Sequence, residues 1–357
     1  MSSFVELLSE FLQRAPMRYE SLTEQVGVER QTLYRWRTGK ALPNKREHVI
    51  KLAEALYLTA RQADELLIAA NFIPQNPDFI TLPLSDDEPL VPVITRPIIQ
   101  PRQFFGRRGI LKRIFQAWNR TSLEHVAIIG PKRSGKTSLL NYLMHIHHAT
   151  GLREGQQKIA LKYNYDWVFI DFEDVRMQHP NSLLNHILTK LGLPTTENDL
   201  IEFTEILEDN LHRPTVILMD NIEKGLQAEA LDQTFWWNMR SLGNHCAGGK
   251  LGFCVTSQQL PAELAESLHK PSPFFNIFEP IQLTAFTTEE ALELIHATPT
   301  SFTSDDIEWI LAHSRGFPLL LQLLCHVRLI ALEEKQSTEQ WQQIGLQRIE
   351  KYNYFFE

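Results

Sequence analysis

The sequence feature that most constrains the fold is the stretch 130–137, which reads G-P-K-R-S-G-K-T. It fits the pattern G-x-x-x-x-G-K-S/T in full. Glycine suits both ends because the backbone must curl tightly and aim successive N–H groups at phosphate oxygens, which a Cβ atom would obstruct. The apolar run 125–129 predicts a buried strand before the loop, and residues 138–144 predict a helix after it. Strand, loop and helix in this order are the structural context of a phosphate-binding loop.

This loop predicts a nucleotide site. Lys136 is expected to reach the β- and γ-phosphates, and the Thr137 hydroxyl is expected to hold Mg²⁺. The alternative is a glycine-rich turn that only caps a helix, and the strand before the loop argues against it. The loop by itself therefore predicts a nucleoside triphosphate with Mg²⁺ as the cofactor. The predicted cofactor-binding residues here are Gly130, Ser134, Gly135, Lys136, Thr137 and Ser138.

A second apolar run, residues 215–221, carries Asp220 near its end. ATPases with a phosphate loop use a neighbouring strand to deliver a carboxylate to the Mg²⁺ water shell. Thr137 and Asp220 are therefore the predicted metal ligands, and Lys136 and Asp220 are predicted catalytic groups. Further apolar runs predict strands at 167–172, 250–258 and 278–283, and helices are expected at 181–191 and 288–294.

Composition sets the class of protein. With 357 residues, 43% of them hydrophobic and 22% charged, the chain is long enough for two or three globular domains. The N-terminus lacks the basic segment of a secretory signal peptide, and the longest apolar run, residues 317–325, is interrupted by Gln322. We therefore expect a soluble cytoplasmic protein with no membrane partner. The three cysteines lack the spacing of a zinc site or a disulfide framework.

Charge is distributed unevenly along the chain. The net charge of −8 is mildly acidic, but residues 28–51 hold seven basic side chains against two acidic ones, a local net charge of +5. The rest of the chain therefore carries −13. A basic patch confined to one small region of an acidic protein indicates a nucleic-acid contact there.

The first seventy residues have the pattern of short helices. Apolar residues at positions 4, 7, 8, 11 and 12 recur at helical spacing, and Pro16 is expected to end that helix. A second helix runs to Val26, Gly27 supplies a sharp turn, and a third helix follows at once. Read onward through residues 37–43, R-T-G-K-A-L-P, the segment resembles the lambda-repressor-like (XRE-type) helix-turn-helix family. The resemblance implies an all-α DNA-binding domain over residues 1–73.

The same resemblance implies which side chains contact double-stranded DNA. Five residues, Glu29 and the four at 30, 31, 32 and 35, would face the major groove, where Arg and Gln can form paired hydrogen bonds with guanine and adenine edges. Three cations after them, at positions 37, 40 and 45, would contact phosphates. The alternative is a protein-docking module whose basic residues form a solvated face. The predicted DNA-binding residues are, in this order, Arg30, Gln31, Thr32, Arg35, Arg37 and Lys40.

The segment 74–103 changes character, because seven prolines are scattered over residues 74–101. Proline at this density prevents helix and sheet, so we expect an extended linker whose residues 98–101 pack on the domain that follows. That domain is expected to be an α/β P-loop domain over residues 104–284, with a parallel sheet between helices. A helical lid is expected over residues 285–357.

Two more motifs flank the phosphate loop. Residues 104–107 read F-F-G-R, which alone is also the pattern of a turn packed on a core, and residues 315–318 read R-G-F-P. With the loop and the strands near Asp220 and at 250–258, their order resembles the STAND-type signalling ATPases, which are related to AAA+ proteins. In that family the F-x-G-R box and the proline of the G-x-P motif lie beside the adenine. The resemblance adds these predicted cofactor-binding residues: Phe105, Gly106, Arg107 and Pro318.

The sequence departs from this family in two places. Asn221 stands where many hydrolysing relatives carry the carboxylate that polarises the attacking water, and an amide cannot act as a base. Gln258 ends the sensor strand, where the family often has arginine. Glu223 is the predicted substitute base, and it joins Lys136 and Asp220 as a predicted catalytic residue. We therefore expect slow ATP hydrolysis at most.

The family resemblance implies a nucleotide switch, in which ADP holds a closed form and ATP favours an open, self-associating form. The predicted function is an ATP/ADP-switched DNA-binding regulator of transcription or defence signalling, with a sensor or effector protein supplied separately. Two alternatives stay open. One is an AAA+-like DNA-remodelling ATPase that selects transposition targets or initiates replication, and the other is a signalling scaffold whose N-terminal helices dock protein.

Overall fold

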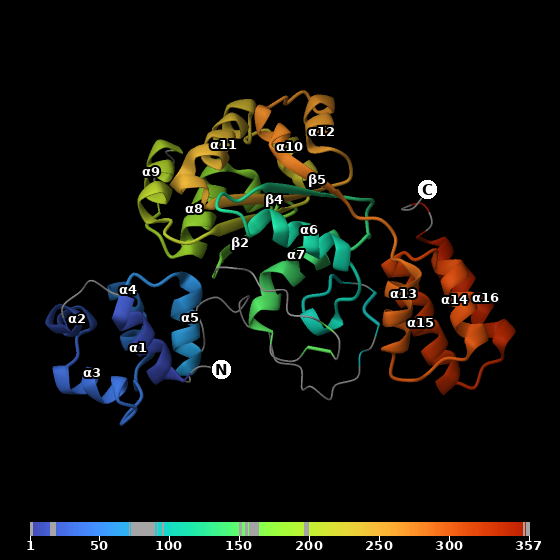
Figure 1. Ribbon diagram of the computed structural model, residues 1–357, viewed down its shortest axis with the longest axis horizontal. Helices are drawn as coiled ribbons and strands as arrows, with labels where there is room; N and C mark the ends of the chain where they lie inside the picture. Colours follow the sequence, from blue (N-terminus) through green and yellow to red (C-terminus); the bar gives the residue numbers. More distant parts are fainter. Residues whose placement is uncertain are drawn as a thin grey trace. The chain divides into compact units, whose positions relative to one another are not determined.

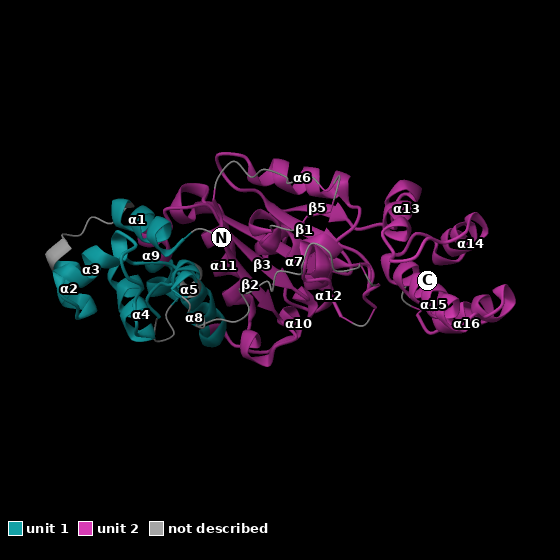
Figure 2. Ribbon diagram, turned by 90° about the horizontal axis from the view of Figure 1, so that it is seen from below, with its two compact units in different colours: residues 1–81, 181–206 teal, residues 82–180, 207–357 magenta. Residues whose placement is uncertain are grey.

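The computed structural model describes residues 3–14, 19–70, 72, 90, 92–94, 96–149, 152–153, 156, 164–195, 200–352 and 354. Contacts between Cα atoms divide the chain into two compact units, residues 1–81 with 181–206 and residues 82–180 with 207–357 (Figure 2). Pro16 and residues 74–89 of the predicted linker lie outside the described residues. The predicted domain boundaries at residues 73, 103 and 284 stay predictions.

The second unit is built on a five-stranded parallel sheet (Figure 1). Its strands lie in the order β2-β3-β4-β1-β5, and every neighbouring pair is parallel. The three central strands are buried throughout, which explains their continuous apolar runs. The predicted α/β domain is confirmed, and each predicted strand agrees with the structure within one residue. The strands are β1 (His125–Ile129), β2 (Asp166–Asp171), β3 (Thr215–Asp220), β4 (Leu251–Ser257) and β5 (Phe278–Gln282).

Helices lie on both faces of this sheet. On one face α6 (Arg108–Trp118) turns Ile114 and Trp118 into a core shared with Leu143 of α7 (Lys136–His145). On the other face the Trp236 ring of α11 (Gln233–His245) stacks on Phe274, with ring centroids 5.7 Å apart. Figure 1 shows α6 and α7 below the sheet and α10, α11 and α12 above it. The remaining elements are α10 (Ile222–Gln227), α12 (Pro261–Ser267), η2 (Pro101–Gln103), η3 (Ile146–His148), η4 (Val175–Gln178), η5 (Cys246–Gly249) and η6 (Pro273–Asn276).

Two helices span the boundary between the units in sequence. α8 (Pro180–Leu191) confirms the helix predicted at 181–191, and α9 (Leu200–Asn210) follows it. Both are amphipathic, with Ile187 and Leu188 of α8 and Phe203 of α9 fully buried.

A four-helix lid follows the sheet: α13 (Thr288–His296), α14 (Ser304–Ser314), α15 (Pro318–Glu333) and α16 (Thr338–Glu350). Three of these helices begin with capping boxes, whose side chains satisfy backbone N–H groups of the first turn. α15 begins with Pro318 in its first turn and buries Leu320, Leu324 and Cys325 in the lid core together with Trp341. The predicted helical C-terminal region is consistent with this arrangement.

The N-terminal region is helical, as predicted. Its apolar core contains Leu8, Leu22, Leu33, Trp36 and Leu52. Gly27 lies between the second and third helices with φ +74°, a backbone conformation that favours glycine. The five helices are α1 (Phe4–Arg14), α2 (Tyr19–Val26), α3 (Arg30–Arg37), α4 (Arg46–Ala55) and α5 (Ala60–Ala69).

None of the helices in the described ranges combines the length and the apolar composition that crossing a bilayer requires.

Candidate nucleotide-binding site

The phosphate loop connects β1 to α7, as the sequence predicted. Gly135 precedes α7 with φ +98°, and Arg133 also has a positive φ, +62°. A Cβ atom on Gly130 would come within 3.0 Å of the Leu283 carbonyl oxygen and the Ser134 hydroxyl. Glycine is therefore required at position 135 by the backbone angle and at position 130 by close packing.

The Lys136 ammonium is held at the mouth of this loop. Its Nζ donates hydrogen bonds to the Gly130 oxygen at 2.8 Å and to the Pro131 oxygen at 2.9 Å. Burial lowers the pKa of Lys136, while the nearby carboxylates of Glu223 and Asp220 oppose that shift. The loop thus holds a partly buried cation in a fixed place.

The Asp220 carboxylate lies beneath the loop and accepts two hydroxyl hydrogen bonds. Thr137 Oγ1 donates to Oδ2 at 2.7 Å, and Thr256 Oγ1 donates to Oδ1. Burial raises the pKa of Asp220, and the bonds from Thr256 and Thr137 act in the opposite direction.

The Thr137 hydroxyl and the Asp220 carboxylate fit the oxygen ligands that Mg²⁺ prefers. Across the described residues, no group of three or more His, Cys, Asp or Glu side chains could hold a metal ion. One carboxylate with one hydroxyl matches the way Mg²⁺ is shared with substrate phosphates in nucleotide sites.

Asn221 and Glu223 are both engaged in hydrogen bonds. Asn221 adopts φ +58° and ψ +50°, and its Nδ2 donates to Asp171 Oδ1 at 3.0 Å. Glu223 Oε1 accepts the backbone N–H of Gln258 at 2.6 Å. The predicted substitute base therefore binds the end of the predicted sensor strand, and Thr256 of that strand donates to Asp220.

The F-x-G-R box contacts the phosphate loop through Arg107. Arg107 is 4% exposed, and its guanidinium donates to the Ser134 oxygen at 3.2 Å and to the Thr284 oxygen. Burial lowers the pKa of Arg107 to about 10, and Glu290 opposes the shift. Arg107 thus joins the loop to the segment between β5 and α13, a bracing contact that the sequence did not predict.

A cavity of about 610 Å³ contains most of the predicted cofactor-binding residues. Phe105, Arg107, Ser134, Gly135, Lys136, Thr137, Ser138 and Pro318 line it, together with Asn221, Glu223 and Gln258. Gly106 and Gly130 shape the backbone: a Cβ on Gly106 would come within 3.0 Å of Glu290, and Gly130 packs against Leu283. The cavity is large enough for a nucleotide.

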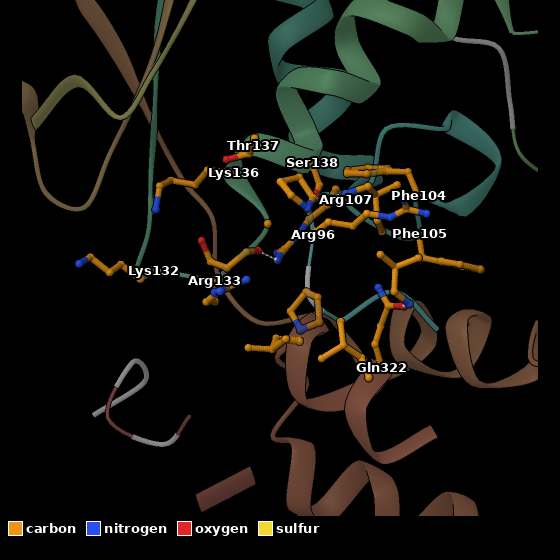
Figure 3. A pocket seen from close by; sticks show the side chains of 18 of the residues that line it. Arg96, Phe104, Phe105, Arg107, Lys132, Arg133, Lys136, Thr137, Ser138 and Gln322 are labelled. Atoms are coloured by element: carbon orange, nitrogen blue, oxygen red, sulfur yellow. Dashed lines mark hydrogen bonds between the residues drawn. The ribbon is translucent and has the colours of Figure 1, made fainter. Parts of the chain in front are cut away.

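The cavity has two chemically different ends (Figure 3). The charged end carries Lys132, Arg133 and Lys136 from the loop, and the apolar end carries Phe104 and Phe105. Further apolar lining comes from Val93, Ile94, Ile98, Phe286, Leu294, Pro318 and Leu319.

Sequence reasoning missed several residues of the cavity. Part of the predicted linker, residues 92–94 and 96–98, forms a segment that we call the strap, and it contributes Arg96 to the lining. Gln322 and Glu173 also line the cavity. Gln322 did give a signal, because it interrupts the apolar run 317–325, whereas nothing in the proline-rich sequence singled out Arg96. The expectation that residues 98–101 pack on the following domain is confirmed by Ile98 and Pro101.

The predicted DNA-binding residues lie on and after α3. Leu33 and Trp36 turn inward and are buried, which leaves the opposite face of the helix in solvent. Thr32 is half-buried, and the other five predicted residues are exposed: Arg30, Gln31, Arg35, Arg37 and Lys40.

Residues 102–261 match the family model described as an AAA domain. Two solved structures of the ORC2 protein of Aeropyrum pernix are similar in fold. The first, described as ADPNP-ADP complexes, is 14% identical with a TM-score of 0.52, and the match covers 73% of this chain and 70% of that one. The second, the ADP form, is 14% identical with a TM-score of 0.50, covering 73% and 71%. No curated protein matches the sequence.

These comparisons confirm the P-loop fold, and the family model that residues 102–261 match is an AAA domain. The finer assignments, the STAND class and the helix-turn-helix, stay predictions.

Proposed function

We propose that this protein is an ATP/ADP-switched regulator of the STAND class that binds double-stranded DNA through α3 and hydrolyses ATP slowly. The observation that carries the nucleotide part is the hydrogen bond between Thr137 and Asp220, 2.7 Å long, beneath a loop that already holds Lys136 in place. These three side chains are those that phosphate and Mg²⁺ require, and they meet although 83 residues separate Thr137 from Asp220.

The cavity supports a nucleoside phosphate as the ligand. A nucleotide has an apolar, aromatic base at one end and anionic phosphates at the other, which matches the apolar and charged ends of the cavity. Thr137 and Asp220 would hold Mg²⁺, which would neutralise phosphate charge when bound. The fold similarity to a protein solved with ADPNP and ADP supports the same ligand class.

Slow hydrolysis follows from the hydrogen bonds around the site. Asn221 carries an amide that is bound to Asp171, and Glu223 is bound to the Gln258 N–H. Asn221 has no carboxylate to polarise an attacking water, and one oxygen of Glu223 is already bound to the Gln258 N–H. A protein that retains its nucleotide suits a switch, in which ATP and ADP favour different forms through their differential affinity and the ATP form self-associates.

DNA binding is supported by the exposed cations of α3. Arg30 and Arg35 are both exposed on α3, whose inward face carries buried Leu33 and Trp36, and guanidinium groups can form paired hydrogen bonds with base edges. Arg37 and Lys40 are exposed just after them, where they could neutralise phosphates.

A second candidate is an AAA+ ATPase that remodels DNA, in transposition target selection or replication initiation. The AAA domain match and the similarity to the ORC2 structures favour this candidate, because they support an AAA+ type without favouring the STAND class within it. ATP-dependent assembly on DNA of any sequence would favour the second candidate over the first.

The decisive experiment is to identify the nucleotide retained by the purified full-length protein. We expect copurified ADP, lost in Lys136→Ala, because the ammonium held at 2.8 Å from Gly130 would bind the phosphates. Rapid steady turnover by the wild type would count against a switch, and a nucleotide-free wild type that binds no added ATP would exclude nucleotide binding.

DNA binding is tested separately by gel shift of the full-length protein. Arg30→Ala with Arg35→Ala should weaken binding, and binding should fall steeply as salt rises. Absence of any salt-dependent shift by the wild type would favour a separate partner protein as the ligand of the N-terminal helices.

A further inference from the structure

The strap is fastened at both ends to the unit that contains the cavity. At one end the Val93 N–H donates to Gln322 Oε1 of α15 at 2.6 Å. At the other end the Ile98 N–H donates to Ser138 Oγ of α7 at 3.0 Å, and Asn141 Nδ2 donates to the Ile98 oxygen at 3.1 Å. The strap therefore connects the lid to the helix that follows the phosphate loop.

Side-chain burial supports these hydrogen bonds. Gln322 is 8% exposed in a helix that is otherwise apolar around it, and a buried amide without a partner is costly. Ile94 packs on the lid core and Ile98 packs on the core of the sheet. The strap is thus part of the cavity wall, and its packing begins before residue 98, where the sequence predicted it to start.

Arg96 lies between the two anchors and lines the cavity. Its side chain is exposed, and it forms neither a hydrogen bond nor an ion pair with any residue that the structure describes. Figure 3 shows Arg96 between the loop cations Lys132 and Lys136 on one side and Phe105 on the other. Five cations line the cavity, and only Glu173 and Glu223 among the lining residues carry negative charge. The cations are Arg96, Arg107, Lys132, Arg133 and Lys136.

We propose that the strap is part of the nucleotide site and that Arg96 forms an ion pair with the phosphates of the bound nucleotide. The proposal rests on the proposed function, because it adds a ligand contact to the same cavity. A guanidinium group is planar and binds phosphate through two parallel hydrogen bonds. The hydrogen bonds at Val93 and Ile98 hold described parts of the strap before and after Arg96, which reduces the backbone ordering that ligand binding requires.

Because of this contact, nucleotide binding should stabilise the hydrogen bonds of the strap. A ligand bound to both the phosphate loop and Arg96 favours the arrangement in which α7, the strap and α15 are joined. Amide hydrogen exchange at Val93 and Ile98 should therefore slow when ADP binds. Gln322→Ala should raise the exchange rate of the Val93 amide, whereas Gln322→Glu keeps an acceptor oxygen and should preserve its protection.

The test starts from full-length wild type, Arg96→Ala, Arg96→Lys and Arg113→Ala, each freed of copurified nucleotide before titration or hydrogen exchange. Each protein is titrated with ADP, and with adenosine by competition against a fluorescent nucleotide. Arg113→Ala is the matched control, since its guanidinium is half-exposed and pairs with Glu279 outside the cavity. We expect Arg96→Ala to weaken ADP binding about tenfold and to leave adenosine binding unchanged, with Arg96→Lys between the two. Arg113→Ala should bind like the wild type.

Two results would overturn the phosphate contact: equal ADP affinity for Arg96→Ala and the wild type, or an equal loss of ADP and adenosine affinity. Unchanged exchange at Val93 and Ile98 on addition of ADP would overturn the strap as part of the site. A wild type that binds no nucleotide overturns the proposed function and this proposal together. A wild type that binds ADP while Arg96→Ala is unaffected overturns this proposal alone.

Discussion

Thr137 Oγ1 donates a hydrogen bond to Asp220 Oδ2 over 2.7 Å, which joins the first turn of α7 to the last residue of β3. In the parallel sheet β4 lies between β1 and β3, so the two residues reach each other at the carboxyl edge across an intervening strand. Thr256 of that intervening strand binds the other oxygen of the same carboxylate. The strand that carries Asp220, the adjacent strand β4 and helix α7 therefore fix the position of its carboxylate.

Asp220→Asn should raise the stability of the ligand-free protein and abolish Mg²⁺-dependent stabilisation by ADP. Burial raises the pKa of Asp220, so the ionised carboxylate is disfavoured in the fold and its contribution to stability falls as pH rises through the folded pKa. A neutral amide of the same shape should therefore raise the Tm without ligand at pH 7. The same variant should lose the Mg²⁺-dependent stabilisation by ADP, which is about 2.7 kcal/mol for the wild type at 100 times Kd. Thermal unfolding with ADP, in Mg²⁺ and in EDTA, measures both effects, and an undiminished Mg²⁺ effect in the variant would contradict the metal role.

Gly316→Ala should destabilise the unit that contains the lid. Gly316 has φ +73°, and a Cβ atom there would lie 2.8 Å from the Phe286 carbonyl oxygen. The left-handed backbone alone costs about 1 kcal/mol for alanine, and the contact with a backbone oxygen should raise the total to about 3 kcal/mol. Gly248→Ala is the matched control, because Gly248 has φ +65° and open space around the added atom. Urea unfolding should show a larger loss of unfolding free energy for Gly316→Ala than for Gly248→Ala. Equal losses would show that the Phe286 backbone moves away from the added Cβ atom at no cost.

Arg153→Ala should remove the ion pair and hydrogen bonds that join the lid to the F-x-G-R box and the residues before it. The Arg153 guanidinium is 11% exposed, pairs with Glu293 at 2.8 Å, and donates to the oxygens of Arg102 and Phe104, each at 2.8 Å. Losing a buried pair should cost about 3 kcal/mol in the free energy of unfolding. Arg108 pairs with the same Glu293 carboxylate but is 72% exposed, so Arg108→Ala should cost less than about 1 kcal/mol. Denaturant titration of both variants measures the difference between their losses of unfolding free energy. Equal losses would show that Arg153 contributes no more than a surface charge.

His125 should make stability depend on pH. Its Nδ1 accepts the Phe253 N–H at 3.0 Å, and burial lowers the pKa of His125 to about 4. The unfolded chain binds this proton near pH 6.5, so the contribution is complete above pH 6.5 and is lost as pH falls from there toward 4. The loss should reach about 3 kcal/mol, measured by urea unfolding between pH 7 and pH 4.5.

His125→Asn keeps an acceptor oxygen for the Phe253 N–H and should flatten this part of the pH profile. The control is His269→Asn, which replaces an exposed imidazole at φ +59°, a backbone angle that asparagine tolerates. That control should keep the wild-type profile. A wild-type profile that survives in His125→Asn would assign the dependence to another group.

Much of the fold could be predicted from local pattern. The central strands are buried on both faces, so their sequences are continuous apolar runs that are easy to recognise. The phosphate loop needed glycine at positions 130 and 135 for reasons that act within a few residues. Asp220 was found because it ends such a strand. Of the predicted extended linker only residues 98–101 were expected to pack, whereas Val93, Ile94 and Arg96 also line the cavity. Proline excludes helix and ladder but does not prevent packing.

The sequence by itself determined the residue types that phosphate and Mg²⁺ require and the order of the elements that carry them. Tertiary structure alone decided the hydrogen-bond partners. Thr256 donates to Asp220, Arg107 donates to the Ser134 and Thr284 oxygens, and Gln322 accepts the Val93 N–H. The physical reason is the sequence range over which each kind of interaction acts. Backbone angles, helical spacing and strand burial act over neighbouring residues, whereas a buried guanidinium or amide is satisfied by whichever distant oxygen or N–H the packed elements bring to it.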